Sequence, residues 1–154
     1  MYKFLSIILI GILLFFYCPQ YTLADIAQEY TGTFYIYTYQ NFNTEFVQTT
    51  KNGNGYIIST ETKNAKELLS LLNKNLIQGM SLAVEHSQLD LATFLHKTNS
   101  KIIFNENIDE LSFIYAYSPI FNEHITYNEQ KINLQICKNQ NLIHIGIPLI
   151  LGSM

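Results

Sequence analysis

The 154-residue sequence contains no arginine and no tryptophan, and only 14% of its residues are charged. All nine basic residues are therefore lysine. Nucleic-acid binding needs basic patches that displace phosphate counterions, and this chain lacks them, so we expect no nucleic-acid partner. The absence of arginine also removes bidentate clamps for carboxylates and phosphates. For the same reason we do not expect binding to an anionic membrane surface.

Cysteine is scarce as well, with Cys18 near the N-terminus and Cys137 in the body of the chain. Small exported domains that depend on disulfides carry dense, even-numbered cysteines. Loss of the segment that carries Cys18 would leave no intramolecular disulfide. We therefore expect a fold held by its apolar core, with Cys137 as a buried thiol or, alternatively, in an intermolecular bridge.

The N-terminus has the three zones of a secretory signal. Lys3 is the only charge before Asp25, an apolar run follows from Phe4 to Tyr17, and small side chains at Thr22 and Ala24 offer an A-x-A-like cleavage site. The run is shorter than the ~20 residues of a relaxed transmembrane span. The sequence thus predicts a signal peptide over residues 1–24 and a single secreted or extracytoplasmic domain over 25–154, retention as a membrane anchor being the alternative. The mature domain would carry eight lysines against twelve acidic residues, a net charge of −4.

Hydrophobic periodicity predicts an α+β domain with an antiparallel sheet and two helices packed on one face. Asn64 to Leu76 has apolar residues at helical spacing with a capping box from Asn64 to Glu67, and a shorter helix, capped by Ser87 with Asp90, ends near Asn99. Alternating or β-rich segments predict strands at 33–39, 46–50, 56–60, 80–84, 101–105, 111–118, 125–127, 131–137 and 142–147. Turns are expected at 51–55, at Asp109-Glu110 and at 128–130.

Two short segments resemble each other: Ile36–Tyr39 and Ile114–Tyr117 match at an offset of 78. This match predicts a pseudo-duplication, the alternative being that tyrosine-rich strands resemble one another by composition alone.

The second half of the chain carries a family resemblance. The segments Tyr115–Pro119, Lys131–Ile136 and Ile145–Ile150 are similar to those of the YwmB-like family of exported proteins, and the likeness covers roughly Gly79 to the C-terminus and more loosely Tyr30 to Leu76. It implies a fold similar to the TATA-box-binding protein, a curved antiparallel sheet with helices on one side. The family supplies no catalytic residues to transfer, and DNA binding does not follow from the fold.

No motif in the sequence predicts a catalytic, cofactor-binding or metal site. His86, His96, His124 and His144 lack the close spacing of metal ligands. Asp109-Glu110 is explained by a turn. Ser118 lacks a nucleophile elbow, and no local motif supports Cys137 as a nucleophile.

The chain contains eleven tyrosines, whose side chains combine a large ring with a polar hydroxyl. Tyr35, Tyr37 and Tyr39 are expected on one strand face, and Phe113, Tyr115 and Tyr117 share another. Tyrosine is enriched at interfaces, so these tyrosines are candidates for an interaction surface, the alternative being a core face under the helices.

The function predicted from the sequence is a non-enzymatic binding or adaptor domain at the cell surface, with an unknown protein or cell-envelope partner. The alternatives are an envelope-acting enzyme and a membrane-anchored regulatory partner.

Overall fold

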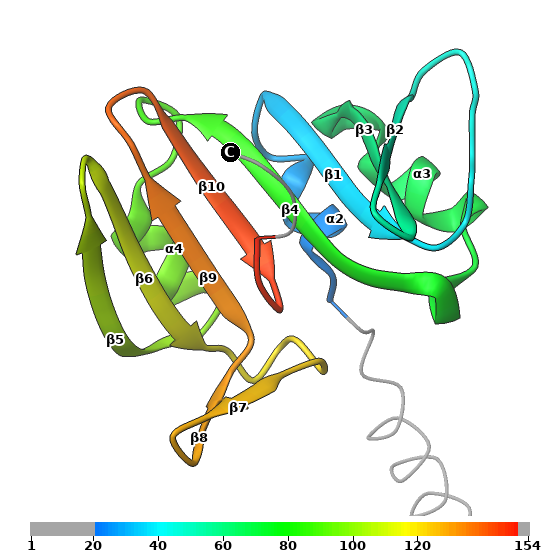
Figure 1. Cartoon of the computed structure of the whole chain (residues 1–154). Coiled ribbons are helices and arrows are strands. Elements are labelled where there is room, and N and C mark those ends of the chain that lie inside the picture. The colour runs from blue at the N-terminus through cyan, green and yellow to red at the C-terminus, as the bar shows by residue number, and fades with distance from the viewer. Residues whose placement is uncertain (1–20, 151–154) are drawn as a thin grey trace, which may run out of the picture.

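The computed structural model describes residues 21–150, which form an α+β fold with an eight-stranded antiparallel sheet whose helices cover one face (Figure 1). Across the sheet the strands follow the order β2 (Gln48–Asn52), β3 (Gly55–Glu61), β1 (Gly32–Thr38), β4 (Ile77–Glu85), β10 (Leu142–Ile147), β9 (Leu134–Lys138), β6 (Leu111–Tyr117) and β5 (Lys101–Ile108). The helices are α2 (Leu23–Ala27), α3 (Ala65–Leu71) and α4 (Leu91–Lys97), with 3-10 turns η1 (Thr62–Asn64) and η2 (Lys74–Leu76) on either side of α3. A separate hairpin pairs β7 (Ile125–Tyr127) with β8 (Gln130–Ile132).

The core lies between the sheet and the helices, because alternate residues of each strand point to that side. Phe34 and Ile36 of β1 are fully buried there, as are Leu82 of β4 and Ile145 of β10. The helices complete the layer with Leu23, Ile26, Leu68 and Phe94. The expected two-layer arrangement is confirmed, with a third helix, α2, that the sequence analysis did not assign.

The helix expected over Asn64–Leu76 is shorter than its apolar pattern. α3 ends at Leu71, and Leu72 is extended at φ −96° and ψ 149°. The predicted capping box is wrong, because Asn64 makes no side-chain cap hydrogen bond and the helix continues from η1. In α4 the cap is Asp90 alone, whose carboxylate accepts from the Ala92 and Thr93 amides.

The strand expected over 131–137 is interrupted at Asn133, which separates β8 from β9. The Asn133 side chain is buried and accepts from the Ser118 amide at 2.7 Å. It also donates to the carbonyls of Ser118 and Phe121 at 2.8 and 2.9 Å. Because the Asn133 side chain hydrogen-bonds to the loop that follows β6, residue 133 belongs to neither strand. β8 therefore leaves the main sheet and pairs with β7.

The expected turns are present: Asp109, Asn128 and Glu129 have positive φ, as has Gly53 between β2 and β3. The strand order divides into two four-stranded halves that meet where β4 pairs with β10. Of the two segments that match at an offset of 78, the first lies in β1 except for Tyr39, which follows it, and the second lies in β6. These strands are third and second from opposite edges and so not at mirrored positions.

Candidate functional site: the helix-free sheet face

The predicted tyrosines lie on the face of the sheet opposite the helices. Phe34 and Ile36 of β1 point into the core, so strand alternation directs Tyr35 and Tyr37 to the helix-free side. Tyr39 follows the strand and is 50% exposed, with its ring centroid 6.3 Å from that of Tyr37. We call these three residues the tyrosine row.

A second group of rings lies on the same face over β5, β6 and β7, and we call it the aromatic cluster: Phe104, Phe113, Tyr115 and Tyr127. The Phe104 and Tyr115 rings stack at 4.3 Å between centroids, and the Tyr127 ring lies 5.5 Å from Phe104. Phe113 stacks beside Tyr115 at 6.5 Å. Tyr117, the remaining predicted ring, shares this face with Tyr115 and is half-buried.

Polar contacts fix the centre of the cluster. The Tyr115 hydroxyl donates to Glu106 Oε1 at 2.6 Å and accepts from Gln135 Nε2 at 3.2 Å. Burial, reinforced by the nearby Glu106 carboxylate, raises the pKa of Tyr115 to about 12. The phenol therefore stays neutral at physiological pH and acts as a hydrogen-bonding support, not as a base.

The tyrosine row and the aromatic cluster are separate. Strands β4, β10 and β9 lie between β1 and β6, which places the two groups about 19 Å apart at ordinary strand spacing. Part of that interval is covered by the chain after β10, which turns back over the face: the Ile150 amide donates to Gln135 Oε1 at 2.9 Å. A Cβ at Gly146 would lie 2.3 Å from the Ile150 nitrogen, so only glycine permits this close approach.

The hairpin of β7 and β8 brings Tyr127 over the cluster. In Figure 1 this hairpin extends from the end of the sheet that carries β6 and β9. Its three β7 residues are exposed, and Tyr127 is 52% exposed. The buried hydrogen bonds of Asn133 therefore position the most exposed ring of the aromatic cluster.

One nucleophile and one base meet on this face without forming a reactive pair. Cys137 of β9 lies opposite His144 of β10 in the ladder. Burial raises the pKa of the Cys137 thiol and lowers the pKa of His144, so both stay neutral at pH 7. A neutral, buried thiol is a poor nucleophile, since the thiolate is the reactive form.

The other candidate groups remain dispersed. Among residues 21–150, no three His, Cys, Asp or Glu side chains are grouped in a way that could hold a metal ion. Glu45 and Glu61 line a shallow pocket of about 450 Å³ beside β3, but the Glu61 carboxylate is largely exposed and paired with Lys63. This pocket therefore lacks the desolvation that distinguishes a catalytic acid from a catalytic base.

The sequence analysis found the tyrosines but not all of their neighbours. It missed Phe104 because a bulge in β5 shifts the register between Ile102 and Phe104, moving that ring to the helix-free face opposite Tyr115. It missed Tyr127 because only the break at Asn133 turns the hairpin toward the cluster. Regular alternation along a strand carries no signal for either event.

Comparisons with known proteins add no assignment: no family model matches the chain, and no curated protein or solved structure matches it either. Within residues 21–150, none of the helices has the length and apolarity needed to cross a bilayer.

Proposed function

We propose that this protein is an exported, non-enzymatic binding or adaptor domain that contacts a cell-envelope partner through the helix-free face of its sheet. The observation that carries the proposal is the aromatic cluster, a group of stacked rings that presents a half-exposed Tyr127. Rigid aromatic side chains supply large contact area at little entropic cost and are enriched at binding surfaces.

The construction of the cluster supports binding better than catalysis. The part-buried hydroxyl of Tyr115 is held neutral and hydrogen-bonded at both its donor and acceptor positions. An acidic chain without arginine also favours a partner that is not itself a polyanion.

The same proposal includes membership in the YwmB-like family and a curved sheet similar to that of the TATA-box-binding protein. Their support is the one-sided placement of the helices and the division of the sheet into two four-stranded halves. Export rests on the zones of the N-terminal sequence, which lie mainly outside the described residues.

The proposal is tested by photo-crosslinking in the source cells. A photoreactive residue at position 127 should give a discrete adduct, whereas the same residue at position 71 should not, because Leu71 is similarly exposed at 48% but lies on α3 behind the sheet. With the partner identified from the adduct, Tyr127→Ala should weaken binding at least tenfold, an effect of ~1.4 kcal/mol, and Leu71→Ala should not. Equal crosslinking from both positions would refute a specific surface on the helix-free face.

A further inference from the structure

Helix α2 belongs to the folded core although it spans the predicted cleavage site. Leu23 and Ala24, on the N-terminal side of that site, are fully buried, as are Ile26 and Ala27 beyond it. All four pack into the same core as the sheet. A cut after Ala24 would therefore remove half of the buried apolar side chains of this helix.

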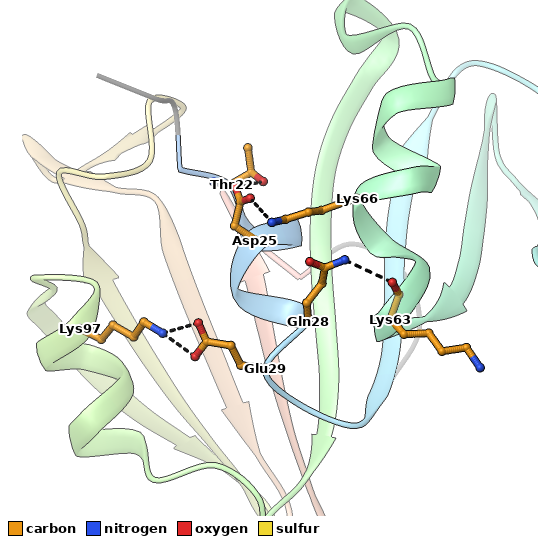
Figure 2. Close-up of polar contacts among 7 residues, drawn as sticks. All are labelled: Thr22, Asp25, Gln28, Glu29, Lys63, Lys66 and Lys97. Atoms are coloured by element: carbon orange, nitrogen blue, oxygen red, sulfur yellow. Dashed lines mark hydrogen bonds and ion pairs between the residues drawn. The ribbon is translucent and has the colours of Figure 1, made fainter. Parts of the chain in front are cut away.

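Polar contacts hold α2 to both neighbouring helices, as Figure 2 shows. The Asp25 carboxylate accepts from Lys66 of α3 at 3.0 Å, and Gln28 Nε2 donates to the Lys63 carbonyl at 3.2 Å. On the other side, Glu29 forms an ion pair with Lys97 of α4. α2 and the two residues that follow it, Gln28 and Glu29, thus connect η1 and α3 of one half of the sheet to α4 of the other half.

The first turn of α2 also depends on a residue before the predicted cut. Asp25 Oδ2 accepts from the amide and the hydroxyl of Thr22, both at 2.7 Å. Burial alone would raise the pKa of Asp25, but these two bonds and the one from Lys66 outweigh it, so the pKa is lowered. Cleavage after Ala24 would remove Thr22 and leave only three residues of α2, less than one helical turn.

We infer that the exported protein is not cut after Ala24: α2 stays whole, and the chain upstream of Tyr21 remains attached. The inference rests on the export that belongs to the proposed function. Upstream of Tyr21, the residues from Phe16 to Gln20 contain no second pair of small side chains at the spacing of a cleavage site. The apolar run of residues 4–17 therefore stays attached to the protein as a membrane-associated anchor.

The decisive experiment is intact-mass analysis of the full chain expressed in its source cells, for the wild type and for Thr22→Asn. Asparagine keeps an N-cap side chain but replaces the small residue at the predicted site. We expect the full-length mass for both proteins in the membrane fraction. A chain beginning between Phe16 and Tyr21 would keep α2 intact but refute the retained N-terminal run, and a wild-type chain beginning at Asp25 would overturn the whole inference.

Export is tested separately by adding protease to intact cells. A full-length protein that resists the protease would refute export, and with it both the location in the proposed function and the inference, whereas a protease-sensitive chain beginning at Asp25 would refute the inference alone. A second measurement concerns the core itself: Leu23→Ala in the full chain should lower the thermal midpoint by about 10 °C, and the exposed control Leu71→Ala should leave it nearly unchanged. An unchanged midpoint for Leu23→Ala would contradict a structural role for α2.

Discussion

Replacing Asn133 with alanine should destabilise the protein more than its small size suggests, because three hydrogen bonds end on one buried amide. The side chain accepts from the Ser118 amide and donates to the carbonyls of Ser118 and Phe121. Both Asn133 and Ser118 are fully buried, so water cannot replace the lost partners without opening the loop.

The expected magnitude follows from the groups left unpaired. A buried polar group without a partner costs ~1–3 kcal/mol, and three of them with partial relaxation should cost about 4 kcal/mol. A domain of this size has a total stability of ~5–15 kcal/mol, so the loss would be a large fraction of it. With a urea m-value of about 2 kcal/mol/M, the unfolding midpoint should fall by roughly 2 M.

The assay is urea unfolding followed by circular dichroism and tyrosine fluorescence, since the chain has no tryptophan. The matched control is Asn107→Ala, an exposed asparagine of β5, which should change the free energy of unfolding by less than about 0.5 kcal/mol. If Asn133→Ala and Asn107→Ala gave the same midpoint, the hydrogen bonds of Asn133 would not hold the loop. The attribution of the β8–β9 break to them would then be wrong.

Three further predictions concern the helix-free face. The pKa of His144 is lowered, so the folded state binds a proton at this residue less readily than the unfolded state does. The free energy of unfolding should therefore be highest above about pH 6.5 and fall as the pH drops below that value. His144→Gln should remove this part of the pH dependence in thermal unfolding scans. Tyr115, with its pKa of about 12, should be missing from the tyrosines that ionise near pH 10 in an absorbance titration, and Tyr115→Phe should leave that early phase unchanged. Gly146→Ala should displace residues 148–150 from the helix-free face, so that the Ile150 amide loses its hydrogen bond to Gln135. Hydrogen exchange at that amide should then become faster. Unchanged exchange would argue against the close approach of Ile150 to Gly146.

The sequence predicts most of the strands because their apolar and polar residues alternate, as in β1, where buried Phe34 and Ile36 separate exposed-side tyrosines. The prediction fails where a side chain ends a strand by hydrogen-bonding to residues that are distant in the sequence. Asn133 looks like one more polar position in an alternating strand, and only its bonds to residues 12 and 15 positions away reveal the break. The early end of α3 is a similar case, since Leu72 continues the apolar stripe while the chain has already become extended.

The candidate site was predictable in part for the same reason. Alternation placed Tyr35, Tyr37, Tyr115 and Tyr117 on strand faces, but it did not determine which face the helices would cover. The bulge that presents Phe104 and the hairpin that presents Tyr127 arise from tertiary contacts. The sequence prediction places Leu23 and Ala24 of α2 in the signal peptide, because small and apolar residues suit both a cleavage site and a buried helix.

The place of β10 in the sheet has a consequence for the order in which the chain can fold. The last strand in the described sequence occupies the middle of the sheet, between β4 and β9. Until residues 142–147 emerge from a ribosome or translocation channel, both of those strands have an unpaired edge, and the halves have no ladder joining them. Such edges are templates for pairing with other chains. Vectorial synthesis therefore leaves this protein most vulnerable to misassembly just before its final strand closes the sheet, and a chain truncated before that strand should aggregate and not fold.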